Sequence, residues 1–263
     1  MAQITYTGTE NENPIIISSK AKHPLEEKIA PRKTIVYETL VDPAVIKVAG
    51  ENLKDELFTK YLFLKPQPNE VKIVSIEKFY EPFILISGHY SIDYYRKHIW
   101  TIKVENEISE VIFPFARFKT KETAGSSGKI SKAVVIEGEE RLKIENQASL
   151  SLNQSGMDIS LKQLPSPPSE KNPEETLAEF CVKKVPPNID LTILRTRIQK
   201  RPTDISWIAN ETFEVNERTV IYTPRFRVTL KHVKTGKQKT AEFDGVNGKL
   251  IHLGDSRETR PAI

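Results

Sequence analysis

The chain has 263 residues, with 39 Lys and Arg against 35 Asp and Glu, a formal net charge of +4. This length suits one large domain or two ordinary ones, and 38% hydrophobic residues are enough to build a core. A basic excess this small does not by itself indicate nucleic-acid binding, and without an 18-residue apolar run we expect no membrane-spanning helix.

Two further features point to a cytoplasmic protein. The N-terminal residues lack the basic and apolar regions of a signal peptide. The single cysteine, Cys181, cannot form an internal disulfide or supply a cysteine zinc site. A reducing compartment is therefore predicted.

Residues 1–33 are polar and interrupted by prolines, which indicates a flexible N-terminal tail with a short strand at 14–18. A first α+β module is predicted at 34–114, beginning with a strand at 34–40. A helix at 51–64 is expected next. Its apolar stripe consists of Leu53, Leu57, Tyr61 and Leu64.

Alternating apolar residues then predict four strands that form an antiparallel meander. These strands are expected at 71–80, 83–90, 94–104 and 107–114.

Residues 115–188 differ in composition and are predicted to form a β-rich insertion with a Pro-rich linker. A hairpin turn is expected at 153–156, and the linker covers 165–173. The other predicted elements are strands at 133–136, 141–152 and 157–164 and a short helix at 174–184.

A second α+β module is predicted at 189–254, followed by a C-terminal tail at 255–263. Asp190 is placed to cap a helix that Pro202 ends. The Thr235-Gly236 and Asn247-Gly248 pairs predict hairpin turns. The strands expected here are 206–209, 211–220, 225–233, 239–244 and 249–253.

The two modules share sequence features that suggest a duplication. Phe79–Ile86 and Ile221–Val228 both contain a Tyr-x-Pro motif, at Tyr80 and Tyr222. Val104–Ile112 and Phe243–Ile251 give each module a similar ending. The fold class predicted is therefore α+β, with two helix-plus-antiparallel-meander modules in tandem.

The ending at Phe243–Ile251 combines Asp244, Gly245, Asn247 and Gly248, residues that favour a tight turn with positive φ and side-chain bonds to the backbone. This ending resembles that of the small PepSY-type helix-plus-meander modules. The resemblance covers about 60 residues of each copy. It implies a non-catalytic module that binds or restrains a partner. The first copy departs from the pattern, with Glu105, Asn106 and Ser109 at three of these positions.

Basic residues gather in the second module, where 14 Lys and Arg stand against 9 Asp and Glu from residue 190 onward. Arg225 and Arg227 are two residues apart and so share one face of a strand, whereas Phe83 and Leu85 occupy the matching positions of the first copy. A solvated face balanced by nearby glutamates is the alternative explanation. The candidate binding residues are Arg195, Arg197, Arg225, Arg227 and Lys231 in the second copy and Phe83, Leu85 and Tyr94 in the first.

No catalytic motif, phosphate-binding loop or metal-ligand spacing is recognisable, so no enzyme activity, cofactor or metal is predicted. The sequence favours a non-enzymatic cytoplasmic interaction or adaptor protein that binds a protein partner or self-associates. Nucleic-acid binding through the basic face and an enzyme of unidentified type are the alternatives. The sequence does not name the partner or the pathway.

Overall fold

The structure is a computed structural model that describes residues 24–58, 66–67, 69–114, 116–124, 130–160 and 166–255. It divides into two compact units, each assembled from separate stretches of chain. Unit 1 contains residues 24–28, His89–Gln147 and Ile198–Glu214, and unit 2 contains Ile29–Gly88, Ala148–Arg197 and the described chain from Val215 onward. Neither unit coincides with the modules expected at 34–114 and 189–254, because long strands contribute residues to both.

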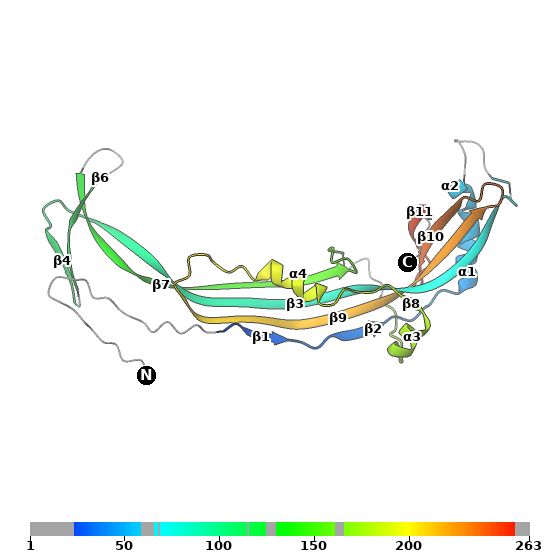
Figure 1. Ribbon diagram of the computed structural model, residues 1–263, viewed down its shortest axis with the longest axis horizontal. Helices are drawn as coiled ribbons and strands as arrows, with labels where there is room; N and C mark the ends of the chain where they lie inside the picture. The colour runs from blue at the N-terminus through cyan, green and yellow to red at the C-terminus, as the bar shows by residue number, and fades with distance from the viewer. Residues whose placement is uncertain are drawn as a thin grey trace, which may run out of the picture. The chain divides into compact units, whose positions relative to one another are not determined.

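The described elements are mostly strands (Figure 1). The helices are α1 (Pro43–Asn52), α2 (Lys54–Phe58), α3 (Pro173–Glu179) and α4 (Ile189–Ile198). The strands are β1 (Glu26–Ile29), β2 (Lys33–Val36), β3 (Val71–Val104), β4 (Glu110–Phe113), β5 (Ala116–Lys119), β6 (Lys121–Ala124), β7 (Ile130–Asn153), β8 (Cys181–Val182), β9 (Trp207–His232), β10 (Gln238–Asp244) and β11 (Leu250–Asp255).

Three strands are far longer than the usual five or six residues. β3 has 34 residues, β7 has 24 and β9 has 26. The prediction of three separate strands between residues 71 and 104 is therefore wrong. Even-numbered residues from Ile84 to Tyr94 are all buried. This alternation passes through the expected break at 91–93 without a turn, and the strand also continues through 81–82, so the segment is one strand.

The prolines of the two Tyr-x-Pro motifs lie inside β3 and β9 without ending them. β2 pairs in parallel with β9 as far as Tyr222, and β10 pairs with β9 from Arg225. Pro224 therefore lies where β9 exchanges one neighbour for another. β8 likewise pairs with β3 only at Phe79 and Tyr80, just before Pro82. A residue without a backbone N–H is tolerated where a ladder is already interrupted.

Nine of the described strands form one sheet, in the order β11-β10-β9-β3-β7-β6. β1 and β2 also pair with β9, and β8 also pairs with β3. β4 and β5 form a separate two-stranded sheet. The large antiparallel sheet with few helices agrees with an α+β class, and the described residues include no helix with the length and hydropathy of a membrane span.

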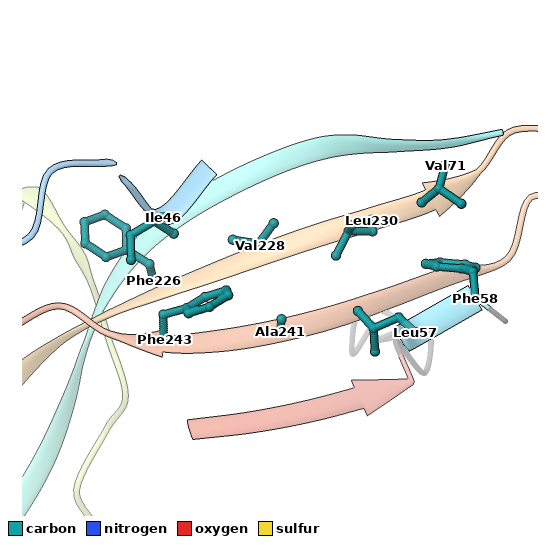
Figure 2. Packing of buried hydrophobic residues seen from close by; sticks show 9 residues of the cluster. All are labelled: Ile46, Leu57, Phe58, Val71, Phe226, Val228, Leu230, Ala241 and Phe243. Atoms are coloured by element: carbon teal, nitrogen blue, oxygen red, sulfur yellow. The ribbon is translucent and has the colours of Figure 1, made fainter. Parts of the chain in front are cut away.

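The main apolar core of unit 2 lies where α1 and α2 cover the β9–β10 part of the sheet (Figure 2). Gly50 of α1 lies so close to β9 that an added Cβ would be 2.9 Å from Val228 Cγ1. The core side chains are Ile46, Leu57, Phe58, Val71, Phe226, Val228, Leu230, Ala241 and Phe243. Alternate residues of β9 and β10 thus provide one wall of this core.

The helix expected at 51–64 begins earlier than predicted. α1 starts at Pro43, and the Asp42 carboxylate accepts a hydrogen bond of 2.7 Å from the Ala44 N–H. An Asp cap followed by proline is a strong start signal that the apolar stripe did not reveal. Leu57 is buried as expected, whereas Tyr61 and Leu64 lie outside the described residues.

Two other predicted segments also differ from the structure. Residues 26–29 were assigned to the tail but form β1, and the Ala30 N–H donates to the Val215 carbonyl at 3.0 Å. The strand expected at 14–18 lies outside the described residues. The insertion strands expected at 133–136 and 141–152 are both part of β7, because alternation again continues between them.

β9, β10 and β11 are consecutive antiparallel neighbours, as expected for the end of the second module, but the strands expected at 206–209, 211–220 and 225–233 are all part of β9. Gly236 and Gly248 have the positive φ values that their hairpin turns require. Asp244 Oδ1 accepts hydrogen bonds from the Val246 and Asn247 N–H groups. Gly245 does not have positive φ; it lies so close to Pro224 that an added Cβ would be 2.8 Å from the Pro224 carbonyl oxygen.

Replacing Gly245 by alanine should therefore lower the free energy of unfolding by about 2 kcal/mol, because backbone would have to move. Gly236→Ala is the control, since open space surrounds Gly236 and only its φ of 71° opposes a side chain. Gly236→Ala should lower the free energy of unfolding by about 1 kcal/mol. Denaturant titration would measure both, and a larger loss for Gly236→Ala would contradict the close approach to Pro224.

The two modules do not follow the same path after Tyr-x-Pro. β9 turns back through β10 and β11, whereas β3 continues to Val104. The ending at Phe243–Ile251 is the β10–β11 hairpin, but β4 pairs with β5 in a separate sheet. A first module built as a four-stranded meander is therefore incorrect, and only the region around the two motifs retains a common arrangement.

Candidate functional site

The two Tyr-x-Pro motifs make corresponding contacts in unit 2. The Tyr222 carbonyl accepts a hydrogen bond of 2.9 Å from the Tyr37 N–H, which follows β2. The Tyr80 carbonyl accepts one of 3.2 Å from the Lys183 N–H, which follows β8. Each motif therefore holds the end of a short parallel strand. This likeness is local and places Tyr80 and Tyr222 in a structural role.

Arg225 is buried in a charged cluster between three strands, with only 6% of its surface exposed. It lies opposite Asp244 in the β9–β10 register, and its guanidinium donates to that carboxylate. Its Nε also donates to Glu81 Oε2 at 3.3 Å, and Lys183 Nζ donates to Glu81 Oε1 at 2.7 Å. The cluster contains two cations and two carboxylates, so the burial of Arg225 is electrically balanced.

Arg227 repeats this arrangement one row further along β9. It lies opposite Glu242 and donates to Glu242 Oε1 through Nε at 3.0 Å and Nη2 at 2.7 Å. Its guanidinium also lies 4.9 Å from the centre of the Phe79 ring. The shared face predicted for Arg225 and Arg227 therefore exists, but carboxylates on β10 neutralise it.

The other predicted binding residues do not form one surface. Arg197 pairs with Asp158 at 2.7 Å, Arg195 is half-buried on α4, and Lys231 is exposed on β9. Phe83 is buried beside Arg225, and Leu85 is half-buried on the same strand. Tyr94 is buried and belongs to unit 1 rather than unit 2. Phe83 and Tyr94 are therefore core residues, which sequence alone did not reveal.

The opposite face of β3 carries a buried hydroxyl at Tyr80. The Tyr80 side chain is fully buried beside Phe180, and burial raises the pKa of its hydroxyl. Neither this hydroxyl nor that of Thr39 has a well-formed hydrogen bond among the described residues. Lys78 lies over the Phe180 ring at 4.1 Å, and burial lowers the pKa of its amine. This region is a packed aromatic contact with two hydroxyl groups that lack a well-formed hydrogen bond.

Replacing Tyr80 by phenylalanine should leave stability unchanged or raise the free energy of unfolding by up to about 1 kcal/mol, because the hydroxyl is desolvated without full compensation. The matched control is Tyr90→Phe, since the Tyr90 hydroxyl donates to Glu211 Oε1 at 2.9 Å. Losing that charged hydrogen bond should cost about 2 kcal/mol. Equal losses for the two variants, measured by denaturant titration, would show that the Tyr80 hydroxyl is satisfied.

Unit 1 also contains a buried carboxylate, that of Glu211. Glu211 is 1% exposed and accepts from Tyr90 and from Arg201 Nη2, the latter at 2.6 Å. Burial, followed by the contact with Glu211, raises the pKa of the Tyr90 hydroxyl. Both Glu211 oxygens are thus occupied by donors within the chain. This arrangement is that of a structural pair rather than an open acid–base site.

The helix α4 begins one residue before Asp190, which was expected to cap it. Asp190 instead accepts two hydrogen bonds from Arg218, of 2.6 Å and 3.0 Å. Burial tends to raise the pKa of Asp190, but Arg218 and the Leu191 N–H hold it below its usual value. The helix prediction is confirmed. The partner of Asp190 was missed because it lies far along the sequence.

The exposed edge of unit 2 is β11, which was predicted as a strand but not as a site. β11 is last in the sheet order and pairs only with β10 among the described strands. Leu250 and Ile251 are 41% and 46% exposed, whereas Leu253 packs against the core. Residues 250–254 contain no Lys, Arg or Pro, the residues that commonly block an exposed edge.

The described residues contain no group of three or more His, Cys, Asp or Glu side chains that could hold a metal ion. Comparison with protein-family models, curated proteins and solved structures gives no significant match. The resemblance of Phe243–Ile251 to PepSY-type endings therefore has no support beyond the turn itself. Function has to be inferred from the geometry of this chain.

Proposed function

We propose that this protein is a non-enzymatic interaction protein that self-associates through the edge of β11. The observation that carries the proposal is an apolar strand with one hydrogen-bonding edge unpaired among the described strands. Such an edge can extend its sheet by adding another strand. The class of function is the one that the sequence favours, but the surface is β11 rather than the residues around Arg225.

A second copy fits this edge better than an unrelated strand, because β11 is self-complementary. In an antiparallel pair of identical strands related by a twofold axis, residues that lie opposite one another point to the same side of the sheet. The axis must therefore pass between two copies of one residue, which then lies opposite itself. Centring on His252 places Ile251 opposite Leu253 and pairs most of the strand. It also places position 249, which is basic, opposite position 255, which is acidic.

The nucleic-acid alternative stays a prediction. Arg197, Arg225 and Arg227 each have a carboxylate partner within the chain, and phosphate contacts would have to displace those partners. Aromatic side chains beside Arg225 and Arg227 are packed against them rather than exposed for base stacking. These contacts favour protein association over nucleic-acid binding.

The wild-type chain has a mass of 30.0 kDa and should sediment as a dimer, with a concentration-dependent share of monomer. Ile251→Lys should weaken this dimer at least tenfold, because each dimer would bury two added charges at its edges. Val74→Lys is the control, since Val74 is 51% exposed on β3, which β9 and β10 separate from β11 in the sheet order.

Circular dichroism should show that both lysine variants remain folded, since neither side chain is buried. A wild-type chain that is monomeric at every concentration would contradict self-association. An equal loss of dimer in Val74→Lys would place the interface elsewhere than β11.

A further inference from the structure

A groove of about 810 Å³ lies in unit 2 between the start of β2 and the segment that follows β8. Arg32 and Thr34 line one side, residues 182–187 line the other, and Tyr222 contributes from β9. β2 and β8 are held in place because each pairs in parallel with one of the neighbouring strands β9 and β3. The groove is therefore built by the same pairing that surrounds the Tyr-x-Pro motifs.

The lining residues combine charge of one sign with apolar surface. Arg32, Lys183 and Lys184 are cationic, and no carboxylate belongs to the lining. Lys183 forms an ion pair with Glu81, whereas Arg32 and Lys184 are exposed. Thr34 and Tyr222, whose side chains carry hydroxyl groups, also line the groove. Cations and hydroxyls at one site favour an anionic group with several acceptor oxygens.

The remaining lining residues are Val182, Val185, Pro186 and Pro187. They offer apolar surface beside the cations, and the two consecutive prolines restrict the backbone of this wall. Small-molecule sites commonly have volumes of about 300–1,000 Å³ and combine an apolar wall with a few polar groups. The groove has a volume in that range and a similar combination of lining residues, and it is open to solvent.

We propose that this groove binds a small amphipathic anion, with its phosphate or carboxylate group at Arg32 and Lys184 and its apolar part against residues 185–187. This binding site does not depend on the edge of β11. Lys184 is the residue to test, because it is exposed.

Octyl phosphate is the first probe, and titration calorimetry on the full chain gives its affinity. It should bind at least tenfold more tightly than inorganic phosphate, which lacks the apolar part, and than octyltrimethylammonium, which has the opposite charge. Octanoate distinguishes a carboxylate from a phosphate preference. Lys184→Glu should weaken octyl phosphate binding at least tenfold, and added salt should weaken it further.

Lys72→Glu is the matched control, because Lys72 is exposed on β3 and does not line the groove. It should leave the affinity unchanged. Equal affinities for octyl phosphate and octyltrimethylammonium would overturn the proposal, as would unchanged binding in Lys184→Glu. Binding to vesicles of anionic lipid without binding to octyl phosphate would also overturn it, since the ligand would then be a membrane surface.

Discussion

Replacing Arg225 by methionine should lower the free energy of unfolding by about 3–5 kcal/mol, the cost of leaving a buried charge without its partner. The Asp244 side chain is only 7% exposed, and among the described residues its ion-pair partner is Arg225. Glu81 would keep Lys183 as a partner. The loss should therefore arise mainly at Asp244, and denaturant titration followed by circular dichroism would measure it.

The control for this prediction is Arg227→Met, one row further along the same strand. Arg227 is 38% exposed, so solvent screens its pair with Glu242 and the replacement should cost no more than about 1 kcal/mol. Adding Asp244→Asn to Arg225→Met should recover part of the loss, because asparagine keeps the acceptor for the turn without the charge. Equal costs for the two arginine replacements would contradict a buried, balanced cluster.

Arg218→Met should also lower the free energy of unfolding by about 3–5 kcal/mol at neutral pH, because Asp190 would remain buried without its cation. The Arg218 and Asp190 side chains are 12% and 4% exposed. Their bond joins α4 to β9, so its loss should also detach the helix. Amide hydrogen exchange along Ile189–Ile198 would report that detachment.

This second replacement should have a pH dependence with a defined sign. The pKa of Asp190 is lowered in the folded chain, so its stabilising contribution is present above the unfolded value near 3.8 and is lost as pH falls through the lower folded value. The difference between wild type and Arg218→Met should therefore shrink on acidification below about pH 4. A difference in unfolding free energy between wild type and Arg218→Met that stays constant down to pH 2 would contradict the pairing of Asp190 with Arg218.

Local turn chemistry was predictable from this sequence. The hairpin turns at Gly236 and Gly248 and the turn ending at Gly156 all have positive φ at glycine, as their residues suggest. The helix ending at Ile198 was also predictable, since Pro202 follows it closely. Each of these features depends on a few neighbouring residues.

Strand length was not predicted, because prolines and isolated polar residues were taken as strand ends. Pro82 and Pro224 lie where a neighbouring strand ends or is replaced by another. Which strands are neighbours is decided by the whole sheet and not by the local sequence. The alternation of Tyr90, Ile92 and Tyr94 with polar residues is the signal in the sequence that would have indicated one strand across 91–93. Uninterrupted alternation is thus a better guide than proline in this chain.

The contacts of the candidate site could not be predicted from local sequence patterns either. Arg225 was placed correctly on a face with Arg227, but its partner Glu81 is 144 residues away in the sequence. Only the assembled sheet shows that the arginines are neutralised and that β11 is the edge. β11 itself was predicted as the last strand of a meander. An end position in a meander therefore deserves to be tested as an interaction surface.

Disulfide formation between two copies tests the association through β11 most directly. His252→Cys in a Cys181→Ala background should give a covalent dimer on mild oxidation, because residues opposite one another in an antiparallel pair have Cα atoms within disulfide reach. Leu250→Cys should not, since its two copies would lie ~13 Å apart. A dimer from both variants, or from neither, would contradict pairing centred on His252.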